Sequence, residues 1–265
     1  MPRLVDTRRR IAISKALLIV HQEHSDPGRV GAIIAELGYE IDRRCPSLGD
    51  PLPENLEEHD AVVIFGGPQS ANDRENDAAP GIRAELNFIP KILESQTSYL
   101  GICLGAQILA KVLGANVRPH PDGCIEAGYY KVEPTADGSQ FLDQSMMFYQ
   151  WHREGFELPS EATLLAQGEL FTNQAFQYGY NAYGIQFHPE VLEPIIRRWS
   201  GQGAERLKTQ GARPVQAHLD GFRKYDPDVD RWIRGFMSTI FDRVSLSIEV
   251  EAANGIRGRA VRFNL

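Results

Sequence analysis

Cysteine is scarce in this chain, and no regular cysteine spacing occurs in its 265 residues. The three cysteines, Cys45, Cys103 and Cys124, are odd in number and irregularly placed. A disulfide scaffold needs paired cysteines, and a structural zinc site needs closely spaced cysteine or histidine ligands. We therefore predict neither disulfides nor a zinc site, and we expect a protein of the reducing cytoplasm.

Long apolar runs and long basic runs are also missing. No apolar stretch reaches the roughly 18 residues that a membrane-spanning helix needs, so we expect no membrane association. The formal net charge is −7, and Arg8–Arg10 is the one basic run, which argues against a nucleic-acid partner. That run loosely resembles a twin-arginine export signal, but Lys15 interrupts the apolar segment after it and no cleavage site follows.

The first half of the chain alternates between strand and helix patterns. The strand candidates are residues 16–21, 39–43, 60–65 and 98–102, and the helix candidates are residues 27–37, 82–93 and 104–113. Such alternation indicates a parallel sheet with helices on both faces.

The second half of the chain changes to short β-rich segments separated by turn residues. These segments are residues 126–133, 146–151, 162–167, 174–178 and 182–186, and they predict that the sheet continues in antiparallel hairpins. Helices are expected at 191–199 and 229–244, with a surface excursion over 200–227. We predict a three-layer α/β fold with a mostly parallel central sheet. We expect one domain over residues 12–244, an N-terminal extension over 1–11 and a C-terminal extension over 245–265.

The segment Gly101–Gly105 carries the strongest chemical signal. Cys103 follows a short apolar run, lies between two glycines and precedes an apolar helical pattern. A sharp strand-to-helix turn needs small neighbours and lifts one side chain clear of the backbone. It also sets the sulfur at a helix N-terminus, where negative charge is favoured. We predict that Cys103 is a nucleophile, and the alternative is a buried cysteine in a glycine-tolerant turn.

A general base is predicted at His188, directly after the expected strand 182–186. A cysteine nucleophile needs an imidazole to take its proton and later return it to the leaving group. Glu190 follows across Pro189 and is placed to hold the tautomer of the ring. The alternative is a loop histidine beside a solvated glutamate. Only folding brings His188 to Cys103, because the two residues are far apart in the sequence.

An oxyanion hole is predicted from the backbone N–H groups of Leu104 and Gly67. Acyl transfer puts negative charge on the carbonyl oxygen, and one backbone donor aimed at it is worth roughly 2.7–4 kcal/mol in the transition state. Leu104 follows the nucleophile, and Gly67 lies in a Gly-Gly-Pro turn after the strand 60–65. An ordinary turn after a strand is the alternative interpretation of Gly67.

Two further residues are candidates for substrate binding. Gln107 lies four residues after Cys103 and therefore shares its helix face. His152 lies between β-like segments, where it would contact substrate or line the pocket, whereas Trp151 is expected in the core. Taken alone, Gln107 is also typical of a surface helix.

Together these motifs resemble the class I glutamine amidotransferase family. Residues 65–68, 101–107 and 186–190 match its motifs in order, and the segment 151–152 is similar to the branch that includes GMP synthase. The similarity spans roughly residues 14–200. It implies a flavodoxin-like fold, a triad of Cys103, His188 and Glu190, an oxyanion hole at Gly67 and Leu104, and Gln107 in the glutamine pocket.

The resemblance implies hydrolysis of L-glutamine to glutamate and ammonia through a γ-glutamyl thioester on Cys103, with no metal and no cofactor. Members of this family usually pass the ammonia to a synthase. About 75 residues follow Glu190, and they lack the Ser-Gly-Gly-x-Asp-Ser stretch of an ATP-pyrophosphatase. A separate acceptor subunit, or no acceptor, is therefore expected.

Two other functions remain open at this point. A γ-glutamyl peptidase would use the same triad on γ-glutamyl peptides instead of glutamine. A non-catalytic binding or regulatory protein would use the scaffold alone, although both Cys103 and His188 are present. A cysteine hydrolase with histidine directly after the nucleophile is disfavoured, because Leu104 holds that position.

Overall fold

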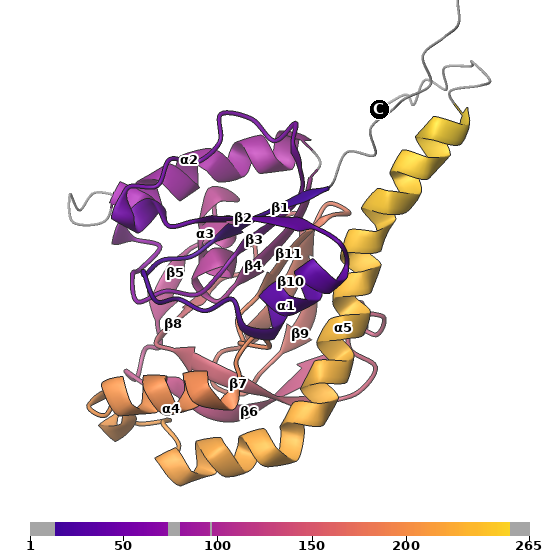
Figure 1. The fold of residues 1–265 in the computed structure, drawn as a ribbon. Helices are drawn as coiled ribbons and strands as arrows, with labels where there is room; N and C mark the ends of the chain where they lie inside the picture. Colours follow the sequence, from indigo (N-terminus) through magenta and orange to yellow (C-terminus); the bar gives the residue numbers. More distant parts are fainter. Residues whose placement is uncertain (1–13, 74–79, 96, 255–265) are drawn as a thin grey trace, which may run out of the picture.

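The computed structural model describes residues 14–73, 80–95 and 97–254, and Figure 1 shows the path of the chain. The expected extension 1–11 lies outside the described residues, as do residues 255–265 of the expected C-terminal extension. Within the described residues, one nine-stranded sheet runs through the molecule in the order β2-β1-β3-β4-β11-β10-β9-β6-β7. The single domain over 12–244 stays a prediction.

Five strands form the parallel half of this sheet. They are β1 (Lys15–Ile19), β2 (Glu40–Arg44), β3 (His59–Ile64), β4 (Ser98–Ile102) and β11 (Ala182–Ile185). In β1, Ala16 and Leu18 join one buried cluster while Leu17 and Ile19 join the other. Side chains alternate across a strand, so β1 is apolar throughout because both faces of the sheet are covered.

The other half of the sheet is antiparallel. Its strands are β10 (Asn173–Tyr178), β9 (Ala162–Gln167), β6 (Glu126–Pro134) and β7 (Met146–His152). Of the eight pairings in the described sheet, four are parallel and four antiparallel. The sheet is therefore mixed, and the prediction of a mostly parallel sheet was wrong, although the expected hairpins are confirmed.

A separate two-stranded sheet pairs β5 (Val117–Pro119) with β8 (Glu154–Phe156). Neither strand was predicted, because three residues are too few to show an alternating pattern. This small sheet matters for the site, because β8 begins at Glu154, which lines a pocket together with Cys103.

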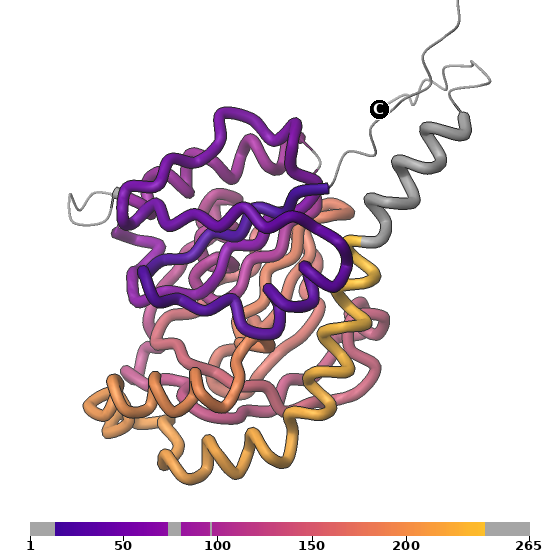
Figure 2. Tube along the Cα trace, viewed as in Figure 1, coloured from indigo at the N-terminus to yellow at the C-terminus, as the bar shows by residue number. Residues whose placement is uncertain are grey.

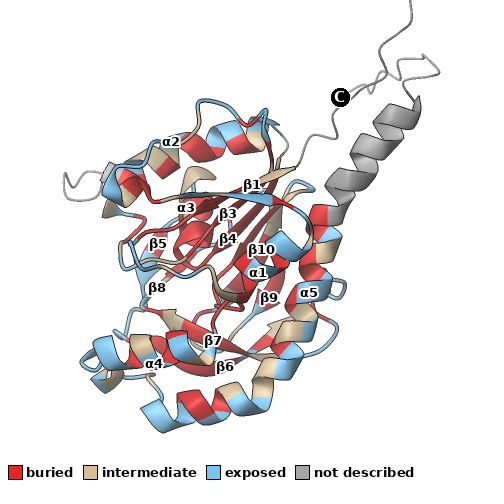
Figure 3. Ribbon diagram, in the orientation of Figure 1, coloured by how far each residue is buried: buried red, intermediate tan, exposed pale blue. Residues whose placement is uncertain are grey.

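Helices cover both faces of the main sheet, as predicted (Figure 3). The helices α2 (Pro80–Ser95) and α3 (Leu104–Val112) pack on one face. On the other face lie α1 (Gly28–Glu36) and α5 (Val215–Asn254), far apart in sequence but side by side in Figure 2. The buried Arg29 of α1 joins them through ion pairs with Asp226 and Asp230 of α5.

The C-terminal helices differ from the prediction. A surface excursion was expected over 200–227, but α4 (Glu193–Gln202) extends into it and α5 begins at Val215. Pro227, where the excursion was expected to end, lies inside α5, which changes direction in Figure 1. Residues 245–254 of the expected extension belong to the same helix. In the described residues, no helix is both long and apolar enough to span a bilayer.

Candidate active site around Cys103

Cys103 occupies a strained turn between β4 and α3. Its φ of 51° and ψ of −103° make it the one non-glycine residue with positive φ among the described residues. A Cβ added to Gly105 would lie 2.1 Å from the carbonyl oxygen of Ile64, so no larger residue fits behind the turn. Strained residues of this kind cluster at functional sites, and this geometry is that of a nucleophile elbow.

The sheet explains how distant segments reach this turn. β11 lies beside β4 in parallel, with Ile185 opposite Ile102, and the N–H of Cys103 donates to the carbonyl oxygen of Ile185 at 2.8 Å. The residues that follow both strands therefore leave the sheet at the same edge. This edge is where open α/β sheets place their ligand sites.

The imidazole of His188 reaches the cysteine. A Cβ added to Gly66 would lie 2.8 Å from Cε1 of His188 and 3.5 Å from Cβ of Cys103, so both residues flank the same backbone position. The Nδ1 atom of His188 donates to Oε1 of Glu190 at 2.7 Å. The Nε2 atom makes no hydrogen bond among the described residues, and it is the nitrogen left for the sulfur and a substrate.

The charge around His188 favours its protonated form. Burial alone would lower the pKa of His188, but the charges of Glu190 and Cys103 outweigh it and raise the pKa from 6.5 to about 10. Because Nε2 makes no well-formed hydrogen bond to the sulfur, Cys103 acts on the ring mainly through charge. The surroundings therefore favour a proton on the imidazole beside the sulfur of Cys103.

A small pocket opens over Cys103. It is lined by Gly67, Pro68, Gln69, Cys103, Gln107, Trp151, His152, Arg153, Glu154 and Arg206. Four of the residues singled out in the sequence, Gly67, Cys103, Gln107 and His152, therefore share one cavity. Leu104 is buried beside it as the first residue of α3, where the N–H has no acceptor within the helix.

Gln107 and His152 both hold the backbone of Glu154. The Nε2 atom of Gln107 donates to the carbonyl oxygen of Glu154 at 2.8 Å and to Oε1 of Gln186 at 3.1 Å. In His152, Nδ1 lies 3.0 Å from the same carbonyl oxygen and Nε2 lies 2.8 Å from Oε2 of Glu126. Both ring nitrogens of His152 are therefore engaged in fixing the pocket wall.

A buried histidine that the sequence analysis missed lies under the Gly-Gly turn. The Nδ1 atom of His21 is 3.1 Å from the carbonyl oxygen of Gly66, and Nε2 is 3.0 Å from Oε2 of Glu85. Both side chains are 0% exposed. Burial lowers the pKa of His21, but the carboxylate of Glu85 and the Gly66 carbonyl outweigh it and raise the pKa above 6.5. Both partners accept hydrogen bonds, so an ionised Glu85 requires His21 to carry both ring protons.

No sequence pattern indicated this pair, because Glu85 lies far along the chain on α2. Arg206 was missed as well, since it falls in the expected surface excursion 200–227, in which the sequence analysis identified no candidate site residue. It lies in a short 3₁₀ turn (Arg206–Lys208) after α4, and only the fold brings it to the pocket.

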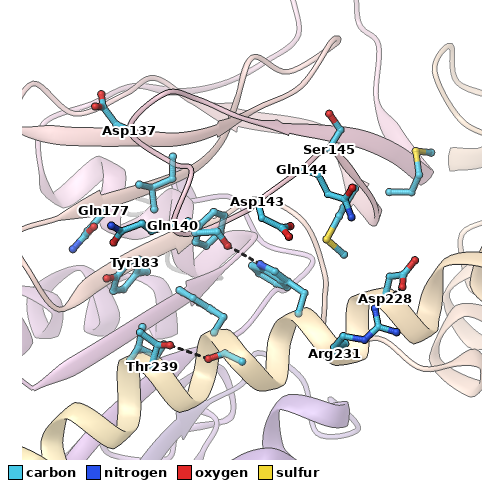
Figure 4. Close-up of a pocket in the computed structure, with 18 of the residues that line it drawn as sticks. Asp137, Gln140, Asp143, Gln144, Ser145, Gln177, Tyr183, Asp228, Arg231 and Thr239 are labelled. Atoms are coloured by element: carbon cyan, nitrogen blue, oxygen red, sulfur yellow. Dashed lines mark hydrogen bonds and ion pairs between the residues drawn. The ribbon is translucent and has the colours of Figure 1, made fainter.

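A larger cavity, of about 760 Å³, lies elsewhere, between α5 and the segment 137–147. Figure 4 shows Asp228 and Arg231 on α5 and Asp143 and Ser145 nearby. Among the residues that the structure describes, its lining has no member in common with the pocket over Cys103 and includes no cysteine or histidine. It is larger than the pocket over Cys103, but no described hydrogen bond joins a serine or threonine hydroxyl of its lining to a carboxylate or an imidazole. No group of three or more histidine, cysteine or acidic side chains in the described residues is arranged to hold a metal ion.

Comparison with known proteins places this geometry in a family. A family model described as glutamine amidotransferase class-I matches residues 34–194. The chain is 33% identical over 206 residues to the glutamine amidotransferase-like protein YfeJ of Salmonella typhimurium, covering 75% of this chain and 85% of that protein. It is also 33% identical over 161 residues to one subunit of the glutamine-hydrolysing GMP synthase of Ignicoccus hospitalis, covering 60% of this chain and 79% of that protein. A crystal structure of a glutamine amidotransferase from Thermotoga maritima superposes with a TM-score of 0.77 at 32% identity, over 86% of this chain and 98% of that one.

Proposed function

Because the chain belongs to the class I glutamine amidotransferase family, we propose that it hydrolyses L-glutamine to glutamate and ammonia through a thioester on Cys103. The observation that carries this proposal is the meeting of Cys103 and the His188–Glu190 pair around Gly66. A nucleophile, a proton carrier and a group that orients the carrier are the parts that acyl transfer requires.

In the proposed reaction, the sulfur of Cys103 attacks the amide carbon and a tetrahedral oxyanion forms. His188 then gives its Nε2 proton to the nitrogen as the C–N bond breaks, which releases ammonia and leaves a γ-glutamyl thioester. Water attacks the thioester and passes a proton to Nε2 of His188. Glutamate leaves, and the sulfur and imidazolium return to their starting states.

The N–H groups of Leu104 and Gly67 are proposed to hold the oxyanion. For Gly67, support comes from the preceding carbonyl, since the oxygen of Gly66 faces Nδ1 of His21. The C=O and N–H of a trans peptide point in opposite directions, so the N–H of Gly67 points away from His21. Gly67 and Cys103 line the same pocket, so we expect the N–H of Gly67 to point into that pocket.

This proposal predicts that His21→Phe lowers kcat by about 10²- to 10³-fold, the loss expected for one oxyanion donor. Phenylalanine keeps a planar aromatic ring but has no hydrogen-bond donor for the Gly66 carbonyl, so the peptide is free to flip. Glu85→Gln should stay within about 10-fold of the wild type, because a glutamine amide can donate to Nε2 of a neutral imidazole that keeps its Nδ1–H. Steady-state kinetics with glutamine measures kcat for both variants.

His59→Phe is the matched control, because His59 is a buried histidine paired with Asp42 at 3.1 Å in a different part of the fold. Alkylation of Cys103 by iodoacetamide should proceed at a normal rate in His21→Phe, since alkylation forms no oxyanion. An equal loss of kcat in His59→Phe, or a lost alkylation rate in His21→Phe, would show a general packing defect instead.

For the released ammonia we propose a separate acceptor subunit. The similarity to a GMP synthase subunit supports this, because the name of that relative describes one subunit of a larger enzyme. The proposal as a whole is tested by a substrate panel of L-glutamine and γ-glutamyl dipeptides, with released ammonia and amino acids measured. Ammonia from glutamine is the expected result, and turnover of the dipeptides alone would favour a γ-glutamyl peptidase instead.

A further inference from the structure

Among the residues that the structure describes, Arg29 is the one buried lysine or arginine, with 4% of its surface exposed. It is the second residue of α1 and lies outside residues 34–194, which match the family model. Burial of a cation costs free energy unless charged partners and hydrogen bonds offset that cost. The contacts of Arg29 therefore indicate why the chain buries a charge at this place.

Arg29 holds the chain directly after His188 through two hydrogen bonds. Its backbone N–H, at the start of α1, donates to the carbonyl oxygen of Glu190 at 3.0 Å. Its Nη2 atom donates to the carbonyl oxygen of Val191 at 3.2 Å. The first N–H groups of a helix have no acceptor within the helix, so α1 offers one of them to the segment that carries Glu190.

The start of α1 is shaped for this contact at Gly28. Gly28 has a φ of 56°, and a Cβ added to it would lie 2.0 Å from the carbonyl oxygen of Glu190. A larger residue at this position would displace the backbone of Glu190, and only glycine combines the positive φ with the necessary room. The close approach of α1 to Glu190 therefore depends on two neighbouring residues, Gly28 and Arg29.

The guanidinium of Arg29 is held from the other side by α5, which lies beside α1 (Figure 2). Its Nη2 atom forms an ion pair with Oδ1 of Asp226, and Nη1 lies 3.3 Å from Oδ1 of Asp230. Nη2 thus bridges two elements, because it donates both to α5 and to the backbone of Val191. Burial raises the pKa of Asp226, and the charge of Arg29 opposes that increase. The guanidinium therefore favours the ionised form of the acid that holds it.

The carboxylate of Glu190 has few contacts of its own. Its Oε1 atom accepts a hydrogen bond from Nδ1 of His188 at 2.7 Å, whereas Oε2 has no hydrogen-bond partner among the described residues. The position of the carboxylate therefore depends on where the backbone of Glu190 lies, and Arg29 holds that backbone. A displacement of about 1 Å at a catalytic group can lower a rate by about 10²-fold.

We propose that Arg29 is a positioning residue, which fixes the backbone at Glu190 so that its carboxylate stays in line with Nδ1 of His188. Asp226 orients the guanidinium of Arg29, and these two residues together form a clamp between α1 and α5. The inference rests on the proposed function. It extends the support of the triad to α5, a helix that lies outside the matched residues 34–194.

Arg29→Met tests the proposal, because methionine keeps an apolar stem but has neither the charge nor a side-chain donor. We expect kcat for glutamine to fall by about 10- to 100-fold, the loss for a displaced catalytic group, while KM stays within about 3-fold. KM should change little because Arg29 does not line the pocket over Cys103. Burial lowers the pKa of His188 and the charge of Glu190 raises it, so the alkaline limb of the kcat/KM profile should move to lower pH.

Arg234→Met is the matched control. Arg234 also joins α1 to α5, through ion pairs with Glu36 and Asp230, but it is exposed and none of its described ion pairs reaches residues 188–191. Both kcat and the pH profile should stay as in the wild type. An equal loss of kcat in Arg234→Met would assign the effect to general packing of the two helices and overturn the proposal. Wild-type kcat in Arg29→Met would overturn it as well.

Arg29→Lys decides the question if Arg29→Met does not fold. A single ammonium group keeps the charge beside Asp226, but it cannot replace the two guanidinium nitrogens that contact α5 and Val191. In this variant kcat should fall, and the alkaline limb should again move to lower pH. Wild-type values of both quantities would reject the role of Arg29.

Alkylation of Cys103 by iodoacetamide separates this inference from the proposed function, because it needs no turnover of glutamine. The imidazolium of His188 favours the reactive thiolate, so alkylation should be slower in Arg29→Met and unchanged in Arg234→Met. Such a difference in a protein whose wild type releases no ammonia would keep the clamp and reject the hydrolysis. An unchanged alkylation rate in Arg29→Met would reject the clamp.

Discussion

Replacing Cys103 with alanine is expected to reduce glutamine hydrolysis by about 10⁵- to 10⁶-fold, as in other enzymes that lose their nucleophile. The thioester cannot form without the sulfur, and the remaining pocket only binds the substrate. The fold should persist, with a change in unfolding free energy below about 1 kcal/mol, since alanine fits the same backbone and removes one atom. Ammonia release and urea unfolding measure the two effects.

Cys45→Ala and Cys124→Ala are the matched controls for this prediction. Both cysteines are buried, as Cys103 is, but neither lines the pocket. Both variants should keep full activity. Normal turnover in Cys103→Ala would reject the thioester mechanism, and unfolding of that variant would leave Cys103→Ser as the substitution to assay, with the same expected loss.

Replacing Glu190 with glutamine should lower kcat/KM by about 10²- to 10⁴-fold, the range for a triad whose orienting carboxylate becomes an amide. Glutamine fills the same space, so the packing around His188 is kept. An amide group can hold the ring in the wrong tautomer and does not stabilise an imidazolium. Kinetics with glutamine measures the loss.

The pH dependence of kcat/KM tests the His188–Glu190 pair through the direction of a shift. The pKa of His188 is raised to about 10 because the charges of Glu190 and Cys103 outweigh burial. A raised pKa means that activity needing the imidazolium is complete at low pH and falls as the pH rises through that value. Glu190→Gln removes one of the raising charges, so the alkaline limb of its kcat/KM profile should move to lower pH.

The raised pKa of His188 also makes the stability of the folded protein depend on pH. An imidazolium favoured by folding stabilises the protein fully below the unfolded pKa near 6.5, and this stabilisation is lost as the pH rises towards 10. The difference in unfolding free energy between wild type and Glu190→Gln should therefore shrink between pH 7 and pH 10. An alkaline limb that does not move, or a stability difference that grows with pH, would contradict the role given to Glu190.

Local sequence patterns predicted the turn at Cys103 because everything that shapes it is local. β4 was predicted over 98–102 and is observed there, and the glycines at 101 and 105 are required by the close approach of the backbone. The helix after Cys103 also lies where its apolar spacing placed it, over Leu104–Val112. The roles assigned to these residues stay predictions.

Local sequence patterns did not predict the contacts between segments that are distant in the sequence. Nothing in residues 182–185 says that this strand lies beside β4, although that pairing is what brings His188 to Cys103. The pairing of His21, which follows β1, with Glu85 of α2 likewise joins segments that are distant in the sequence. Arg206 reaches the pocket through the packing of Gly203 on Trp151, which depends on shape and not on any motif.

The helix α5 shows a different limit of prediction from local sequence. Residues 200–227 were expected to form a surface excursion, and Pro227 is unfavourable inside a helix, because proline lacks an N–H and clashes with the preceding turn. In the structure, tertiary contacts override this local cost: Leu219 before the proline packs near Tyr129, and Phe236 after it joins the main core. Arg29 also holds the helix at Asp226, directly before the proline.

The most direct measurement for the whole account is labelling with a chloroketone analogue of glutamine, followed by peptide mass mapping. The imidazolium at position 188 should activate one thiol, whereas burial raises the pKa of Cys45 and keeps it unreactive. We expect a single modified residue, Cys103, with labelling blocked by glutamine and slowed in His188→Asn. Label on Cys45 or Cys124, or labelling of Cys103 that is indifferent to both glutamine and His188, would contradict the account.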